Sequence, residues 1–320
     1  MTACYNEEEN IRDIYSEVKT VFDDMKEYSY EHLFIDNASE DGTVSILKEL
    51  AGKDKNVKII LNTRNFGPVR SPYHAILQAT GDAVISMAAD LQEPPSMISD
   101  FIRKWEEGYR VVVAVKSKSE ENPVMFVIRK MYYNLIKKFS ETAQIKNFTG
   151  FGLYDRSFID VLRGLDEPYP YFRGLITEMG FEVAKIPFVQ PKREKGKAKI
   201  NLYTLYDVAM LGFVNHSMIP LRMATFIGFT VAIFSLLMAI GYFFYKLLFW
   251  ERFQLGMAPM VIGLFFFAAV QLFFIGIIGE YIGAIYTRIK HRPLVIEKER
   301  INFDLKDPKG KSGYQKGDGV

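Results

Sequence analysis

The chain of 320 residues contains one cysteine and four histidines. Cys4 alone cannot form an internal disulfide, so the soluble part needs no oxidising compartment. Because Cys and His do not cluster, the sequence offers no structural zinc site of the usual kind. The net charge of +2 is too balanced for a general nucleic-acid binder, which would carry a basic stripe on a basic domain. We therefore expect no nucleic acid among its partners.

Charged residues are absent from two long stretches, residues 223–245 and 253–279. Both stretches reach the length of about 20 apolar residues that a helix needs to cross a membrane. Only residues 246–252 separate them, which predicts a transmembrane hairpin within residues 221–290, with helices at about 223–247 and 254–280. The first 20 residues are acidic and lack a continuous apolar core, so we expect no signal peptide there.

The segments around the hairpin carry basic and polar residues. Two crossings place both chain ends on one side, and the flanking cations predict that this side is cytoplasmic: Arg222, Arg288, Lys290 and Arg292. Residues 201–220 form an amphipathic stretch that predicts a helix lying in the membrane interface. Residues 291–320 hold few apolar residues from Glu297 onward, which predicts a disordered cytoplasmic tail.

Residues 1–200 alternate between strand-like and helical patterns. Strands are predicted at 32–36, 57–61, 83–88, 111–115 and 182–190, and helices at 7–25, 43–51, 71–80, 98–107 and 125–139. This alternation is typical of an α/β domain with a mainly parallel sheet and helices on both faces. Ligands of such sheets bind beyond the carboxyl ends of the strands, where Asp36 and Asp90 fall, so we expect both at the rim of one pocket.

Three segments of this domain carry polar residues at strand ends. The segments Tyr5-Asn-Glu-Glu-Glu-Asn10 and Ile35-Asp-Asn-Ala-Ser-Glu-Asp-Gly-Thr43 each fit a turn and a capped helix start when taken alone. Ser86-Met-Ala-Ala-Asp-Leu-Gln-Glu-Pro-Pro95 places an acid after a buried strand. Such a carboxylate can hold Mg²⁺ or Mn²⁺ together with phosphates, and the alternative is a loop acid with Gln92 pointing to solvent.

These segments, together with Arg64-Asn-Phe-Gly67, Arg193-x-x-Gly196-x-x-Lys199 and the terminal hairpin, resemble the family 2 glycosyltransferases that act on polyprenyl phosphates. The similar proteins are the bactoprenol glucosyltransferases and dolichyl-phosphate mannose synthase. The resemblance covers nearly the whole chain and is much less specific for the sugar. It implies a Rossmann-like GT-A fold, a nucleotide-sugar donor and a lipid-phosphate acceptor.

The resemblance also implies roles for individual residues. Tyr5, Glu7, Asp36 and Arg64 would bind the nucleotide sugar, with Asp36 a candidate to read the base edge. Asp90, helped by Gln92, would bind the metal on the donor diphosphate and so act in catalysis. The phosphates of donor and lipid would contact Arg129, Arg193 and Lys199. For the basic loop, a solvated charge run or a contact with anionic lipid is the alternative.

The sequence departs from the family pattern in three places. Ala88 stands where the family usually has the first acid of the metal motif. Residues 147–153 lack the acids and the Arg that many relatives carry, which leaves Asp155 as the nearest acid for a catalytic base. Asp155 could equally pair with Arg156 or Arg173 in a structural role. Only residues 1–4 precede the Tyr5 motif, so the first strand is either very short or lacks residues upstream. In the second case the nucleoside pocket would be incomplete as well.

The favoured function is transfer of one hexose to undecaprenyl phosphate with inversion at the anomeric carbon. We expect a UDP-linked donor rather than a GDP-linked one. The product would serve a cell-surface polysaccharide or glycan. The enzyme would be a multi-pass protein of the bacterial cytoplasmic membrane, with the lipid bilayer as a partner. We also expect it to form a homo-oligomer. A catalytically weak scaffold that binds nucleotide sugar is the first alternative. A sugar-lipid transporter is disfavoured because no charged residue lies inside either apolar run.

Overall fold

The computed structural model describes residues 1–118, 145–165, 167, 170–191, 195, 219–249, 257–289 and 292–303. The chain forms two compact units, of which the first contains the sheet and its covering helices and the second contains two long apolar helices. The predicted helix at 125–139 and the predicted interfacial helix at 201–220 lie outside the described residues, apart from the last two residues of the latter, which begin a long helix.

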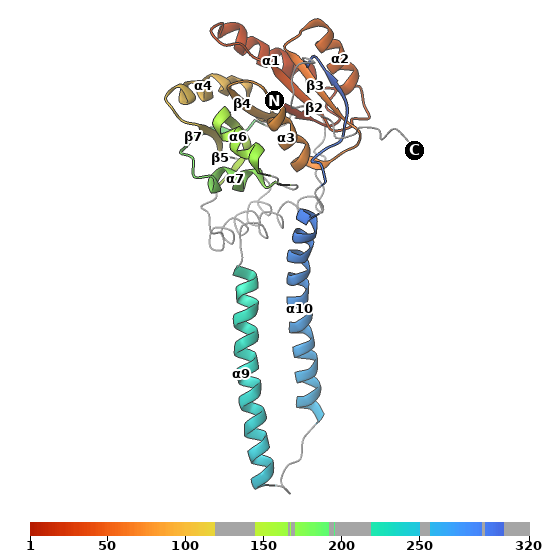
Figure 1. Ribbon diagram of the computed structural model, residues 1–320, viewed down its shortest axis with the longest axis vertical. Coiled ribbons are helices and arrows are strands. Elements are labelled where there is room, and N and C mark those ends of the chain that lie inside the picture. The colour runs from red at the N-terminus through yellow and green to blue at the C-terminus, as the bar shows by residue number, and fades with distance from the viewer. Residues whose placement is uncertain are drawn as a thin grey trace, which may run out of the picture. The chain divides into compact units, whose positions relative to one another are not determined.

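An eight-stranded sheet forms the centre of the first unit, in the order β7-β5-β6-β4-β1-β2-β3-β8 (Figure 1). The strands are β1 Thr2–Cys4, β2 His32–Asp36, β3 Val57–Asn62, β4 Ala83–Ala88, β5 Val111–Lys118, β6 Phe148–Asp155, β7 Val183–Val189 and β8 Glu297–Ile301. Strands β4, β1, β2 and β3 pair in parallel, as predicted. The remainder is mixed, because β6 runs antiparallel to both β4 and β5 and β8 runs antiparallel to β3.

Helices cover both faces of this sheet, as the alternation of elements predicted. One face packs against α1 Ile11–Asp24, α2 Thr43–Lys53 and α4 Ile98–Glu106, and the other packs against α3 Gly67–Gln78, α6 Arg156–Gly164 and α7 Phe172–Glu178. Successive strand residues point to opposite faces. On β2, Phe34 packs in the first of these layers, and Leu33 and Ile35 pack in the second. The three central residues of β2 are all apolar because helices cover both faces of the strand.

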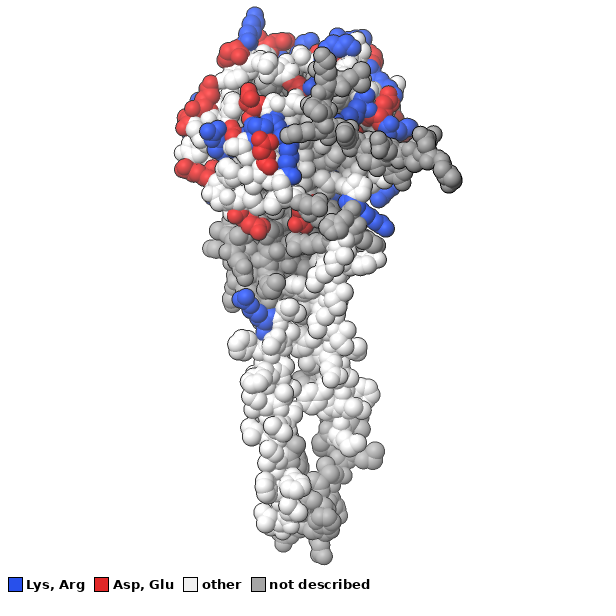
Figure 2. All heavy atoms as spheres, viewed as in Figure 1, with Lys and Arg blue, Asp and Glu red and all other residues white. Residues whose placement is uncertain are grey.

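The second unit contains α9 Ile219–Leu248 and α10 Met257–Ile289. Residues 221–245 and 263–287 within them are long and apolar enough to cross a membrane, with mean hydropathies of 2.2 and 1.9. Neither stretch is buried, and Figure 2 shows both helices almost free of charged side chains. A soluble helix would hide such a surface, so the two helices indicate membrane association, in agreement with the predicted hairpin.

The segment after α10 returns to the sheet, so the prediction of a disordered tail was wrong for residues 292–303. Residues Glu297–Ile301 form β8 against β3, with Ile59 opposite Ile301 and Leu61 opposite Glu299. The part of the chain from Glu297 onward holds few apolar residues, which is why composition alone suggested disorder. An edge strand needs only backbone hydrogen bonds to one neighbour, and β3 supplies them.

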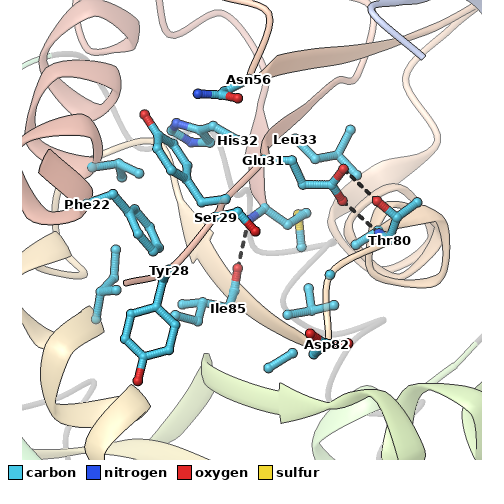
Figure 3. A pocket seen from close by; sticks show the side chains of 18 of the residues that line it. Phe22, Tyr28, Ser29, Glu31, His32, Leu33, Asn56, Thr80, Asp82 and Ile85 are labelled. Carbon is cyan, nitrogen blue, oxygen red and sulfur yellow. Dashed lines mark hydrogen bonds between the residues drawn. The ribbon is translucent and has the colours of Figure 1, made fainter. Parts of the chain in front are cut away.

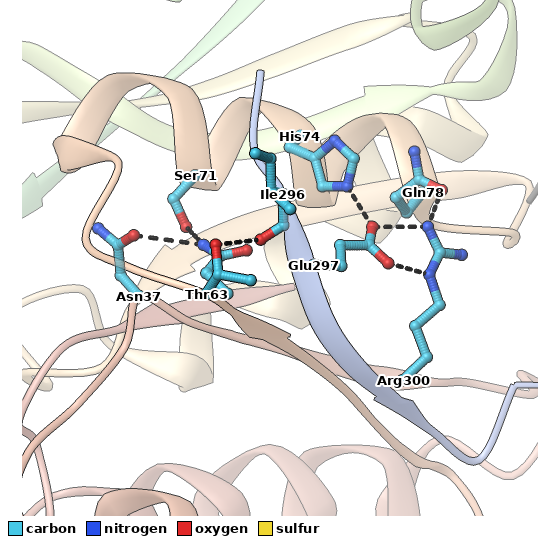
Figure 4. A network of polar contacts seen from close by, with 9 residues as sticks. Asn37, Thr63, Ser71, His74, Gln78, Ile296, Glu297 and Arg300 are labelled. Carbon is cyan, nitrogen blue, oxygen red and sulfur yellow. Dashed lines mark hydrogen bonds and ion pairs between the residues drawn. The ribbon is translucent and has the colours of Figure 1, made fainter. Parts of the chain in front are cut away.

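Side chains of β8 and α3 form a polar network that fastens the segment (Figure 4). Glu297 accepts hydrogen bonds from His74 at 2.5 Å and from Arg300, and Arg300 also donates to Gln78 at 2.8 Å. The backbone amide of Thr63 donates to the carbonyl of Ile296 at 2.9 Å. Although burial opposes it, hydrogen bonding from His74 and Arg300 lowers the pKa of Glu297 to about 2.

Replacing Glu297 by Ala should lower the melting midpoint of the full chain in detergent by about 5 °C, because hydrogen bonds to a charged group contribute about 2 kcal/mol. Glu299→Ala is the matched control on the same strand, since its exposed pair with Lys48 contributes about 0.5 kcal/mol. The lowered pKa means that this stabilisation is present above about pH 4.5 and is lost as the pH falls toward 2. Equal midpoints for the two variants would contradict the role given to the network.

Candidate active site

The carboxyl ends of β1, β2 and β4 lie together at one edge of the sheet. β1 lies between the other two strands, with Cys4 opposite Asp36 and Ala3 opposite Ala88. Because neighbouring strands lie about 4.8 Å apart, the ends of β2 and β4 are separated by about 10 Å. The structure therefore brings the Tyr5 segment, Asp36 and the loop of Asp90 to one edge, as expected from the strand pattern.

The loop after β1 and the loop after β2 are joined by hydrogen bonds in both directions. The amide of Asn6 donates to Ser39 Oγ at 2.8 Å, and the amide of Glu7 donates to Thr43 Oγ1 at 2.8 Å. In return, the amide of Glu40 donates to Asn6 Oδ1 at 2.7 Å. Asn6 has a φ of +53°, a left-handed conformation that asparagine tolerates better than most residues. The two motifs thus form one folded unit that presents Tyr5 and Glu7, both half-buried.

Asp36 is buried inside this unit, with 1% of its surface exposed. Its carboxylate accepts hydrogen bonds from the amide of Ser39 at 3.0 Å and from the Ser39 hydroxyl. Burial raises the pKa of Asp36 from its ordinary value, against the effect of these hydrogen bonds. The Asp36 carboxylate closes its own turn through these hydrogen bonds, and the reading of a base edge by Asp36 stays a prediction.

Asn37 connects this unit to the loop that follows β3. Its side chain donates to Asn65 Oδ1 at 2.8 Å and accepts from the amide of Phe66 at 2.9 Å. Asn62, at the end of β3, donates to Asn37 Oδ1 and to Ser71 Oγ. Sequence reasoning did not single out Asn37 or Asn62, although a polar residue at the end of each parallel strand was the signal that could have found them.

Arg64 lies exposed on the loop that Asn37 holds. Its guanidinium carbon lies 4.1 Å from the centre of the Phe66 ring, a cation–π contact, and Nη1 donates to the carbonyl of Asn65 at 3.1 Å. Phe66 itself is buried, so it orients Arg64 while leaving its charge in solvent. An anionic ligand at this edge could therefore reach the guanidinium.

Asp90 and Gln92 lie half-buried in the turn that follows β4. Asp90 Oδ1 accepts from the amide of Gln92 at 3.3 Å, and Leu91 between them has a φ of +56°. Within the part of the chain that the structure describes, no group of three or more His, Cys, Asp or Glu side chains could hold a metal ion. A carboxylate and an amide oxygen fit a hard divalent cation that takes its remaining ligands from phosphates and water.

Glu93 completes the same turn and is buried, with 8% of its surface exposed. Its two carboxylate oxygens accept from the amide of Ala88 at 2.8 Å and from the hydroxyl of Thr149 at 2.7 Å. Burial raises the pKa of the Glu93 carboxyl from its ordinary value. Glu93 was not among the predicted site residues, because it lies five residues beyond the end of β4 and its contact with Thr149 has no local signal in the sequence.

The segment at residues 147–153 carries two glycines that the backbone requires. Gly150 has a φ of +112°, which residues with a Cβ rarely adopt, and a Cβ on Gly152 would lie 2.3 Å from the carbonyl oxygen of Val112. The acids and the Arg expected from the family pattern are therefore excluded from these two positions by local geometry. This supports the view that the chain has no catalytic base here.

Asp155 lies at the opposite edge of the sheet. It pairs with Ala83 at the start of β4, about 17 Å along the strand from Ala88. Its carboxylate accepts from the Ser157 amide at 2.9 Å, which caps α6, from Trp105 Nε1 at 2.7 Å and from Arg110 at 2.9 Å. The structure thus gives Asp155 a structural role, with Arg110 rather than Arg156 or Arg173 as its cation, and not the position of a catalytic base.

Three further predicted site residues, Arg129, Arg193 and Lys199, lie outside the described residues. Lys195 of the same basic segment is described, and its ammonium lies 2.6 Å from Asp13 on α1. One cation of the segment is therefore engaged by an exposed carboxylate of the sheet unit.

A cavity of about 530 Å³ lies at the amino ends of the strands (Figure 3). Its lining includes Met1, His32 and Glu31, which accepts two hydrogen bonds from Thr80. The first residues of β2 and β4 also line it, so the cavity lies at the edge of the sheet opposite the one that carries the Tyr5 segment.

Known proteins match this chain over most of its length. Residues 1–161 match the family described as Glycosyl transferase family 2. The uncharacterized glycosyltransferase YkcC of Bacillus subtilis is 33% identical over 303 residues, covering 94% of this chain and 93% of that protein. The bactoprenol glucosyl transferase of Shigella phage SfV is 34% identical over 295 residues, covering 92% and 95%. Among solved structures, S. aureus TarS with UDP-GlcNAc matches 67% of this chain and 66% of that chain, with a TM-score of 0.38 and 15% identity.

The sheet, its two helical layers and the polar carboxyl edge define an α/β enzyme domain, to which two apolar helices are joined. The chain belongs to glycosyl transferase family 2 and is a glycosyltransferase. Its mixed sheet is of the GT-A type that the resemblance implied.

Replacing Asp155 by Ala should lower stability by about 2 kcal/mol or more, since it removes a helix cap and leaves Trp105 without its acceptor. The rate per folded molecule should stay unchanged. Asp160→Ala, on the same helix and exposed, is the matched control. Although burial opposes it, hydrogen bonds from Ser157, Trp105 and Arg110 lower the pKa of Asp155 to about 2, so its stabilisation is lost as the pH falls from about 4 toward 2.

The measurement is thermal unfolding of both variants alongside their glycosyl-transfer rates. A loss of rate on the order of 100-fold in Asp155→Ala at unchanged stability would make Asp155 the missing base after all.

Proposed function

We propose that this glycosyltransferase transfers a hexose from a nucleotide sugar to a polyprenyl phosphate, with inversion at the anomeric carbon. The donor is UDP-linked and the acceptor is undecaprenyl phosphate. The reaction takes place at the cytoplasmic face of the bacterial cytoplasmic membrane and supplies a sugar to a cell-surface polysaccharide or glycan.

One observation carries this proposal: the similarity to bactoprenol glucosyl transferases extends over 92% of the chain, and so includes the two apolar helices as well as the sheet. A glycosyltransferase with a water-soluble acceptor has no need of such helices. Joined to an enzyme domain, they keep the site near an acceptor whose hydrocarbon chain stays in the bilayer. Arg222 in the first turn of α9 and Arg292 after α10 favour a hairpin with both ends in the cytoplasm.

The donor is proposed to bind at the carboxyl edge of the sheet. Tyr5, Glu7 and Asp36 would contact the nucleoside, while the exposed Arg64 would contact its phosphates. Asp90 and Gln92 would hold Mg²⁺ or Mn²⁺ against the diphosphate. When bound, such an ion stabilises the charge that develops on the leaving group. Arg129, Arg193 and Lys199, which lie outside the described residues, are the cations expected at the phosphates of donor and lipid.

The chemistry proposed is a single displacement. An oxygen of the lipid phosphate forms a bond to the anomeric carbon, and the bond from that carbon to the nucleoside diphosphate breaks. The second pKa of an alkyl phosphate is about 6, so at pH 7 the acceptor oxygen is already mostly ionised. The protein then has to align the reactants rather than remove a proton, which fits the lack of acids in residues 147–153.

The proposal predicts transfer of radiolabelled sugar to undecaprenyl phosphate by the full chain in detergent. UDP-glucose, UDP-GlcNAc, UDP-galactose and GDP-mannose are tested in turn with Mg²⁺ or Mn²⁺, and label should enter the lipid with one UDP-linked donor. Removal of the metal by EDTA, or Asp90→Ala, should reduce the rate by about 100-fold or more, because charge on the leaving group is then left unstabilised.

Asp100→Ala is the control for the loss of a carboxylate, since Asp100 is exposed on α4 and pairs only along its own helix with Arg103 among the described contacts. It should retain the wild-type rate. Nucleotide binding with no label in lipid for any donor would reject the proposed reaction and support a scaffold that binds nucleotide sugar. Transfer of label to the lipid that persists in EDTA would reject the proposed requirement for a divalent metal ion.

The ionised acceptor predicts a rate that is flat within about two-fold from pH 7 to pH 9 and that falls below about pH 6, as the lipid phosphate takes up a proton. The measurement is the pH profile of transfer at saturating donor and metal. A rate that keeps rising above pH 7 through one ionisation, and loses that rise when one carboxylate is replaced, would show that the protein supplies a base.

A further inference from the structure

The hydrogen-bonded ladder between β4 and β6 ends before β4 does. The pairs run from Ala83 opposite Asp155 to Ser86 opposite Gly152. The next amide of β4, that of Met87, donates to the carbonyl of Met1, just ahead of β1, at 3.0 Å, so the amide of Ala88 points to the β6 side. Continuing the antiparallel register would place Gly150 opposite Ala88. The ladder stops there because Gly150 has a φ of +112°.

Glu93 supplies the acceptor that the ladder no longer provides. One carboxylate oxygen takes the Ala88 amide at 2.8 Å, while the carbonyl of Gly150 accepts instead from the Tyr154 hydroxyl at 2.8 Å. The other oxygen takes the Thr149 hydroxyl at 2.7 Å, so Glu93 connects the end of β4 to β6. An amide left without a partner at this half-buried position would destabilise the turn.

The bond from Ala88 to Glu93 closes a ring that contains Asp90 and Gln92. Inside the ring, Leu91 adopts a φ of +56°, which a residue with a branched side chain adopts only when its surroundings hold it there. The direction of the Asp90 carboxylate therefore depends on the closure. That dependence matters more in this chain, because Ala88 stands at the position where a second acid would share the cation.

We propose that Glu93 is a positioning residue for the Asp90 turn, with Thr149 as its partner, and that it acts without touching cation or substrate. This inference rests on the proposed function, because it takes Asp90 and Gln92 as the groups that hold the cation. Partners that orient a metal ligand typically change affinity by about 10- to 100-fold when they are removed.

Four variants separate positioning from mere folding. Glu93→Gln keeps a carbonyl oxygen for the Ala88 amide and an amide group for the Thr149 hydroxyl, whereas Glu93→Ala removes both contacts. Thr149→Ser keeps the hydroxyl, whereas Thr149→Val replaces it by a methyl group of the same shape. Each disruptive change thus has a conservative control at the same position.

The first measurement is hydrogen exchange of the peptide that covers residues 86–93, in the full chain in detergent. In Glu93→Ala and Thr149→Val the peptide should exchange about ten-fold or more faster than in the wild type. A ten-fold change in the equilibrium constant for local opening corresponds to about 1.4 kcal/mol. Glu93→Gln and Thr149→Ser should stay within about three-fold. This comparison needs neither metal nor substrate.

The second measurement is binding of Mn²⁺ alone, followed by the electron paramagnetic resonance signal of the free ion. The two disruptive variants should bind about ten-fold more weakly than the wild type, and the two conservative variants should match it within about three-fold. Unchanged exchange and unchanged Mn²⁺ binding in Glu93→Ala, even with a lowered melting midpoint, would overturn the proposal.

The two proposals fail separately. Absence of lipid-linked sugar from the wild type with every donor would reject the proposed function, while faster exchange in Glu93→Ala would still show that Glu93 holds the turn. A wild type that transfers sugar and a Glu93→Ala variant with the same metal requirement would reject the positioning role alone. A wild type that binds no Mn²⁺ would overturn the claim that the turn holds a cation.

Discussion

The parallel pairing of β1 with both β2 and β4 is the constraint on which the site depends. Parallel strands end at the same edge, so the loops after β1, β2 and β4 meet there wherever they occur in the sequence. β1 has only three residues, and yet it joins the two halves of the sheet. The hydrogen bonds between the loop of Asn6 and the loop of Ser39 continue that connection beyond the strands, at the same edge of the sheet as the Asp90 loop.

The buried acids among the described residues of this domain accept hydrogen bonds from the protein itself. Asp36 closes its own turn with Ser39, Glu93 accepts the amide that the sheet leaves unpaired, and Asp155 caps α6. A buried carboxylate persists only where hydrogen bonds satisfy it, and loop amides at strand ends are the donors nearest at hand. The half-buried Asp90 differs from these three in its exposure, which leaves it accessible to a ligand. The three buried acids thus differ from Asp90 in how far solvent or a ligand can reach them.

The second half of the chain contributes two features, a pair of apolar helices and an edge strand of the sheet. The apolar helices α9 and α10 favour a bilayer, and the segment after α10 returns to pair with β3. That pairing reaches the loop of Thr63 and Arg64, since Thr63 donates to Ile296. The loop that carries Arg64 is therefore stabilised by the segment after α10, which lies far from it in the sequence. The contacts are backbone hydrogen bonds and the network of His74, Glu297 and Arg300.

Local patterns in the sequence determined much of this protein: the α/β class, the bounds of β2 and β4, the two apolar helices, and the meeting of the Tyr5, Asp36 and Asp90 segments at one edge. These features depend on periodicity, composition and the rule that parallel strands end together, all of which are local or general. Only the tertiary structure decided the roles of Asp155 and Glu93 and the order of residues 297–301. Each of these depends on an antiparallel pairing between distant segments, of β4 with β6 or of β3 with β8, and such a pairing leaves no short-range signal in the chain.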